Sequence, residues 1–110
     1  MTDQVLGVIE PFVRRGLFSS MEQAVTELAR DYVLRQIERY QAISARLQAK
    51  YGMTYEGFQS YLKSRAVALA ANPNPTVNQA IMADEEDALE WKMAREMLQN
   101  WLGLRAETKT

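Results

Sequence analysis

SMEQAVTELARDYVLRQIERYQAISARLQAKYG, residues 20–52, is the stretch that decides the fold. Its apolar residues recur at steps of three and four, which places them in one stripe along an α-helix, with glutamate, arginine and glutamine on the opposite face. The stripe consists of Val25, Leu28, Ala29, Tyr32, Val33, Ile37, Tyr40, Ile43, Leu47 and Tyr51. The sequence therefore predicts one long central helix over about residues 20–51.

Both ends of this helix carry termination signals. The hydroxyl of Ser20 can accept from the backbone of Gln23 while the side chain of Gln23 reaches back, which is a capping box. Gly52 follows the last residue of the stripe, as a glycine after a helix C-terminus does.

The length of the helix bears on the oligomeric state. About 30 residues form a rod of about 45 Å, whereas a compact chain of this size has a radius of gyration of only about 13 Å. We therefore expect that one copy cannot cover the stripe, and we predict a homodimer. The interface candidates are Val25, Leu28, Tyr32, Ile37, Tyr40, Ile43 and Leu47.

The segment before the central helix has two interpretations. Apolar residues between positions 5 and 13 keep helical spacing after an Asp3 cap, and Gly7 leaves room for a kink caused by Pro11. Alternatively, residues 5–9 form a short β-strand and a helix begins at Pro11. We prefer the kinked helix, which Gly16 ends.

Two further helices are expected after Gly52. In the first, over residues 53–72, Thr54 is the N-cap and Met53 packs on Phe58 as a hydrophobic staple. It should fold back along the central helix and stop at the Asn-Pro-Asn-Pro segment 72–75.

The last helix is expected over residues 76–103, from a Thr76–Gln79 capping box to Gly103. It either passes through the acidic segment 84–87 or restarts there with Asp84 as a cap. The chain is thus predicted to be a single all-α domain, residues 1–110, in which residues 1–52 hold the N-terminal and central helices.

The composition excludes several kinds of site. The chain has 13 basic and 14 acidic residues, and it contains neither cysteine nor histidine. Common zinc sites, cysteine nucleophiles and histidine-based triads are therefore excluded. No glycine-rich phosphate loop is present, and no apolar run reaches the roughly 18 residues of a membrane span. We expect a cytoplasmic, non-enzymatic protein with no catalytic residue, no cofactor, no metal and no membrane partner.

Two groups of side chains are candidates for binding. The acidic residues Asp84, Glu85, Glu86, Asp87 and Glu90 have a spacing that could hold Mg²⁺, although carboxylates that complement the start of a helix are the simpler explanation. Large apolar residues near the C-terminus favour a partner protein or a dimer core, and the methionines suit an adaptable contact surface. The candidates for the partner contact are Trp91, Met97 and Trp101.

Residues 12–30, FVRRGLFSSMEQAVTELAR, resemble the helix–loop–helix part of ribbon-helix-helix antitoxins of the ParD kind. In that family an apolar helix ends at a glycine, and an aromatic residue, a serine cap, an acid or amide, two small or branched apolar residues and an arginine follow. The counterparts are Gly16, Phe18, Ser20, Gln23, Ala24, Val25 and Arg30. Residues 50–54 with Phe58, and residues 87–91, are similar to small helical antitoxins of prokaryotes.

The resemblance implies a dimer that binds operator DNA at one end and a toxin through its C-terminal part. A ribbon-helix-helix protein reads DNA with paired strands that carry polar or basic side chains. Residues 1–9 contain no lysine or arginine, so Arg14 and Arg15 are the candidates for contact with DNA phosphates.

Three functions follow from these observations. The leading hypothesis is an antitoxin-like protein–protein interaction protein of a prokaryotic toxin–antitoxin module, whose part from Met53 onward blocks the partner's active site. The alternatives are a DNA-binding regulator of the ribbon-helix-helix type and a helical bundle that binds a metal ion or a small molecule.

Overall fold

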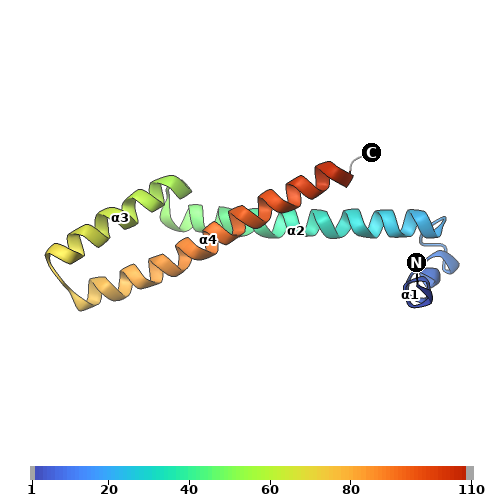
Figure 1. Cartoon of the computed structure of the whole chain (residues 1–110), viewed down its shortest axis with the longest axis horizontal. Helices are drawn as coiled ribbons and strands as arrows, with labels where there is room; N and C mark the ends of the chain where they lie inside the picture. Colours follow the sequence, from blue (N-terminus) through green and yellow to red (C-terminus); the bar gives the residue numbers. More distant parts are fainter. Residues whose placement is uncertain (1, 109–110) are drawn as a thin grey trace.

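Four α-helices joined by short connections make up the structure, a computed structural model that describes residues 2–108 (Figure 1). The helices are α1 (Asp3–Arg14), α2 (Met21–Tyr51), α3 (Tyr55–Ala71) and α4 (Pro75–Thr108). Within residues 2–108 there is no strand, which confirms the all-α class.

The N-terminal segment is helical. α1 covers Asp3–Arg14 with Pro11 inside it, so the alternative of a strand over residues 5–9 is wrong. The N-cap is Thr2 and not Asp3, because the Thr2 hydroxyl accepts from the backbone N–H of Val5 at 3.3 Å. Asp3 lies in the first turn, where a carboxylate complements the helix dipole.

Both ends of α2 agree with the sequence. The Ser20 hydroxyl accepts from the backbone N–H of Gln23 at 3.1 Å, and the Gln23 side chain accepts from the N–H of Ser19 at 2.7 Å. Gly52 has φ 65°, a left-handed conformation that favours glycine, and its N–H donates to the carbonyl of Gln48 at 2.8 Å.

The start of α4 differs from the expected Thr76–Gln79 capping box. The side-chain oxygen of Asn74 accepts from the backbone of Thr76 at 3.0 Å and of Val77 at 3.3 Å. Pro75 therefore occupies the first helical position, where its missing N–H costs nothing.

The length of α4 also differs from the expectation. It passes through the acidic segment without interruption, and it continues beyond Gly103 to Thr108. A glycine inside a helix costs only about 1 kcal/mol, and the Leu-Arg-Ala-Glu segment that follows consists of good helix formers.

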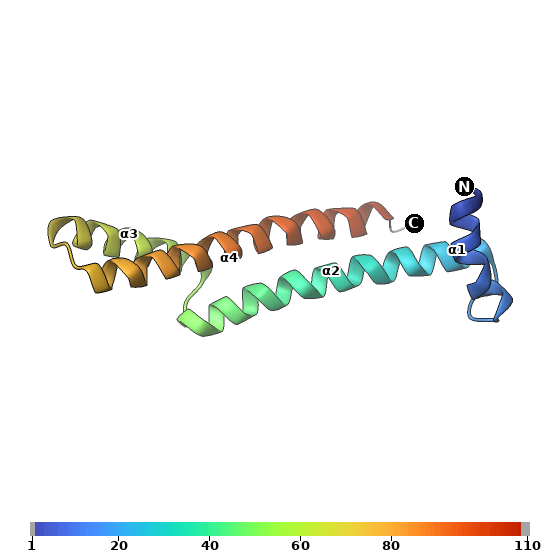
Figure 2. The ribbon, with the colours of Figure 1, turned by 90° about the horizontal axis from the view of Figure 1, so that it is seen from below.

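The chain is elongated, with extents of 68 × 26 × 22 Å and a radius of gyration of 21.6 Å. The dimer prediction assumed that a single chain is compact, and this assumption is wrong. α4 runs antiparallel to α2 and lies along it (Figures 1 and 2). As a result, a single chain already buries part of the α2 stripe, namely Val33, Ile37 and Leu47.

The direction of α3 is a second correction. We expected α3 to fold back along α2, but it points away from the end of α2 and forms a hairpin with the first part of α4 (Figure 1). Since α4 occupies the stripe on α2, α3 packs against α4 instead.

The core lies where α2, α3 and α4 meet. It contains Leu47, Phe58, Ala88 and Trp91, and the partly buried side chains around it are Ile43, Tyr51, Met53, Tyr55 and Leu62. The ring of Phe58 lies 4.1 Å from that of Tyr51 and 5.7 Å from that of Trp91, measured between centroids. Thr54 caps α3, because its hydroxyl accepts from the N–H of Gly57 at 3.1 Å, and Met53 packs on the core as a staple residue should.

Replacing a core leucine tests this arrangement. Leu47→Ala should lower the free energy of unfolding by about 3 kcal/mol, because it removes fully buried methyl groups and leaves a cavity. Leu34→Ala, at an exposed position of the same helix, should cost less than about 1 kcal/mol. Urea titration followed by circular dichroism measures both, and equal costs would contradict the placement of the core.

Candidate interaction surface

α4 is apolar on two sides. The side that faces α2 and α3 buries Ile81, Ala88, Trp91 and Ala94. On the opposite side, Met82, Leu89 and Met93 are spaced by seven and four residues, so they align along the helix. They are 56%, 68% and 46% exposed, and we call them the α4 stripe.

Acidic side chains border the α4 stripe. Glu85 and Glu86 lie between Met82 and Leu89 at helical spacing, and Glu96 lies one turn beyond Met93. All three carboxylates are on exposed residues, and the basic residues within this segment of α4 are Lys92 and Arg95, of which Arg95 pairs with Glu56 of α3. The stripe is thus an apolar surface in a negatively charged surrounding.

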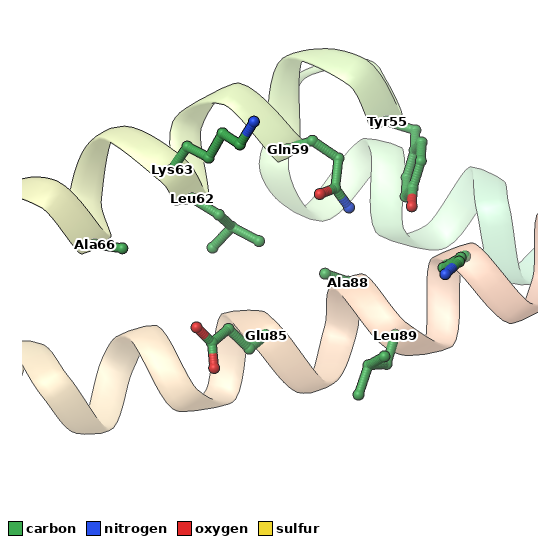
Figure 3. Close-up of a pocket in the computed structure, with 9 residues that line it drawn as sticks. Tyr55, Gln59, Leu62, Lys63, Ala66, Glu85, Ala88 and Leu89 are labelled. Carbon is green, nitrogen blue, oxygen red and sulfur yellow. The ribbon is translucent and has the colours of Figure 1, made fainter.

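A groove between α3 and α4 adjoins the stripe (Figure 3). It has a volume of about 530 Å³, and its lining residues are Tyr55, Gln59, Leu62, Lys63, Ala66, Glu85, Ala88, Leu89 and Lys92. Leu89 belongs to both features, and Glu85, which borders the stripe, also lines the groove, so the groove and the α4 stripe form one continuous surface.

Carboxylates on the inner side of α4 form ion pairs with the other helices. Arg65 Nη1 lies 2.7 Å from Asp84 Oδ2, and Lys50 Nζ lies 2.6 Å from Asp87 Oδ2. Arg46 and Glu90 form a third pair. These three pairs connect α4 to α2 and α3, and we call them the ion-pair ladder.

The hydroxyl of Tyr51 lies at the centre of the ladder. It is 3.0 Å from Asp84 Oδ1 and 2.5 Å from Asp87 Oδ2. Burial, and then its hydrogen bonds to the two carboxylates, raise the pKa of Tyr51 above its ordinary value. The hydrogen bonds from Lys50 and Tyr51 lower the pKa of Asp87. The phenol therefore keeps its proton and Asp87 keeps its charge at neutral pH.

The acidic segment has a different role from either one we considered. Asp84 and Asp87 of this segment, together with Glu90, form ion pairs with α2 and α3. The segment is not at the start of a helix, because α4 begins at Pro75. Among residues 2–108, no three carboxylate, histidine or cysteine side chains come close enough to hold a metal ion.

The dimer candidates on α2 fall into three groups. Ile37 and Leu47 are buried within the single chain. Tyr32 is exposed, and its ring contacts that of Trp101 edge-on at 5.7 Å. The remaining candidates, Val25, Leu28, Tyr40 and Ile43, are half-buried. The structure thus leaves the N-terminal part of α2 as the less covered part of the stripe.

The partner candidates do not share one surface. Trp91 is only 2% exposed and belongs to the core, whereas Met97 and Trp101 are half-buried. The residues predicted to contact a partner did not include Met82, Leu89 and Met93, whose side chains are exposed in the structure. Their alignment on the side of the helix opposite Trp91 is the sequence signal that could have identified them.

Arg14 and Arg15 are exposed at the end of α1. Arg14 forms an ion pair with Glu10 at 3.3 Å on the same helix. Because residues 3–14 are helical, they do not supply the strand with which a ribbon-helix-helix protein reads DNA.

Comparison of the chain with models of protein families, with curated proteins and with solved structures found no match. None of the helices within residues 2–108 combines the length and the apolar character needed to cross a membrane.

The hydroxyl of Tyr51 gives a test of the ladder. Tyr51→Phe should lower the free energy of unfolding at neutral pH by about 1.5 kcal/mol, because two carboxylates lose a donor. Tyr32→Phe, at an exposed ring with no hydrogen bond identified for its hydroxyl, should change it little.

The same variant has a signature at high pH. Since the pKa of Tyr51 is raised in the folded state, its stabilising contribution is present below pH 10 and is lost as the pH rises above that ordinary value. The difference between wild type and Tyr51→Phe should therefore shrink above pH 10, in unfolding experiments at a series of pH values. A constant difference would argue against a phenol held between the two carboxylates.

Proposed function

We propose that this chain is a non-catalytic protein–protein interaction protein of the antitoxin type, which acts as a homodimer and covers a partner toxin with the α4 stripe. The observation that carries the proposal is the exposure of three large apolar side chains in one line on α4. Such a helix face is the usual element that one protein places in an apolar groove of another.

The chemistry of the stripe supports this mode of binding. Methionine side chains are flexible and polarizable, so they adapt to the shape of a partner. Full burial of a leucine or methionine is favourable by about 1.5–3 kcal/mol, so three of them supply a useful part of a binding energy. The adjoining groove between α3 and α4 offers further contact area for the partner.

The charge around the stripe indicates the kind of partner. Glu85, Glu86 and Glu96 favour a protein whose apolar groove is bordered by lysine or arginine. We infer a small basic toxin, whose active site the α3–α4 hairpin covers so that its substrate cannot enter.

Two features of the chain support binding over catalysis. It has no cysteine or histidine, and its most perturbed ionisable groups, Tyr51 and Asp87, are engaged with each other between the helices. The groove between α3 and α4 holds only Lys63, Lys92 and Glu85 as charged groups, and they line an open surface.

Co-expression with the product of the neighbouring open reading frame tests the proposal. The tagged wild-type chain should retain that protein on an affinity column. Leu89→Arg should weaken the complex by at least about 30-fold, because it places a cation in the apolar contact and opposite basic residues. Binding constants from calorimetry give the ratio.

The matched control is Leu34→Arg, which makes the same change at an exposed leucine of α2. It should leave the affinity within about twofold. Failure to retain the neighbouring product, or equal losses in both variants, would count against the α4 stripe as the partner surface. The homodimer is tested separately by sedimentation at micromolar concentration.

A further inference from the structure

Two arginines meet at the end of the α2–α4 contact that is remote from the ion-pair ladder. Elsewhere, ion pairs between different helices bring each cation against a carboxylate. Here Arg30 of α2 and Arg105 of α4 line the same cavity, where the C-terminal end of α4 lies beside the N-terminal half of α2 (Figure 2). Two like charges on one cavity repel each other unless an anion lies between them.

The acidic residues next to Arg30 along α2 have other partners. Glu27 accepts a hydrogen bond from a glutamine side chain of α2 at 3.3 Å, and Asp31 pairs with Arg35 at 2.9 Å. Neither Glu27 nor Asp31 lines the cavity. Among residues 2–108, no carboxylate forms an ion pair with Arg30 or Arg105. The position of Arg105 in the last turn of α4 complements the helix dipole, which explains one of the two arginines and not the other.

The remaining wall of this cavity is mainly apolar. The cavity has a volume of about 300 Å³, at the lower end of the range for small-molecule sites. Val33, which is 8% exposed, and Leu34 line it on α2. The hydroxyl of Thr108 also lines it, but it donates to the carbonyl of Arg105 at 3.1 Å. The two guanidinium groups are therefore its only charged groups, and they are donors without an acceptor.

A second groove continues from the first toward the N-terminus of α2. It has a volume of about 370 Å³, and its lining residues are Val25, Thr26, Ala29, Arg30, Val33 and Thr108. Three of these residues line both cavities, so residues 25–34 of α2 supply one wall over a length of about 14 Å. The apolar space thus begins at the arginine pair and extends along α2.

We propose that these two cavities bind a small amphipathic anion, a carboxylate on an unbranched alkyl chain. The head group lies between Arg30 and Arg105, because the planar guanidinium group matches a carboxylate with two parallel hydrogen bonds. The alkyl chain lies against Val25 and Ala29, where its burial removes apolar surface from water. The site is independent of the α4 stripe, because it involves the last turn of α4 and the N-terminal half of α2.

Binding of this ligand also fastens the end of α4. Without the anion, Arg30 and Arg105 repel each other across the α2–α4 contact. With it, each guanidinium gains an opposite charge, and α2 and α4 are bridged at the end that has no ion pair of the ladder. A ligand that binds the folded chain and not the unfolded one raises its stability as the ligand concentration increases.

Titration with sodium octanoate, below the concentration at which it forms micelles, tests the site. The nuclear magnetic resonance signals of the Arg30 and Arg105 side-chain Nε–H groups should shift and saturate. Arg30→Gln and Arg105→Gln should each raise the dissociation constant at least about tenfold, because the carboxylate loses a charged donor. Arg39→Gln, the same change at an exposed arginine of α2 outside both cavities, should leave it within about twofold.

Two further ligands separate the head group from the tail. Octanol has the same tail without the charge, and acetate has the same charge without the tail, so each should bind at least about tenfold more weakly than octanoate. The absence of a saturable shift with octanoate, or an equal loss in Arg39→Gln and Arg30→Gln, would overturn the proposal. Inorganic phosphate that binds as tightly as octanoate would also overturn it, because the alkyl chain would then have no role.

The melting temperature distinguishes binding from a structural role of the arginines. In the absence of ligand, Arg30→Gln should melt at or above the wild-type temperature, because it removes a repulsion. Saturating octanoate should raise the melting temperature of the wild type and leave that of Arg30→Gln unchanged. Circular dichroism measures both. A lower melting temperature of Arg30→Gln without ligand would assign the arginine to the packing of α2 on α4 and overturn its role in binding.

Discussion

The antiparallel contact between α2 and α4 is the interaction on which the rest of the structure depends. α2 has 31 residues with a long apolar stripe, and no helix of ordinary length could cover it. α4 has 34 residues, a rod of about 50 Å, which is enough to lie along α2 and to extend beyond its end as one arm of the α3–α4 hairpin. Because one helix does both, the position of the hairpin follows from the packing of α4 on α2.

The ion-pair ladder favours one register of α4 along α2. A contact made only by apolar side chains at helical spacing tolerates a shift of one helix along the other by one turn, since the next apolar residue takes the place of the previous one. Ion pairs do not tolerate such a shift, because moving α4 by one turn would separate each cation from its carboxylate. This applies to Arg46–Glu90 and Lys50–Asp87. Partly exposed ion pairs contribute little to stability. Their effect here is on the register, with the Tyr51 hydroxyl held between Asp84 and Asp87.

Local signals made much of the fold predictable from the sequence. The all-α class, the ends of α2 at Ser20 and Gly52, and the cap at Thr54 depend on neighbouring residues, and the structure confirms them. The direction of α3 and the role of Asp84 and Asp87 depend on contacts between residues far apart in the chain. Amphipathic spacing shows which side of a helix is buried but not which helix covers it. For the same reason the sequence did not identify the candidate site. Trp91 was predicted to contact a partner, whereas its ring packs in the core.

The N-terminal part of α4, which carries the α4 stripe, and α1 lie toward opposite ends of the elongated chain (Figure 1). If α4 served only to cover α2, polar residues could replace Met82, Leu89 and Met93 without loss of packing, since these side chains contact solvent. α1, in which no residue is buried, is at the other end of a molecule 68 Å long. The proposed partner can therefore cover the α4 stripe without any contact with α1.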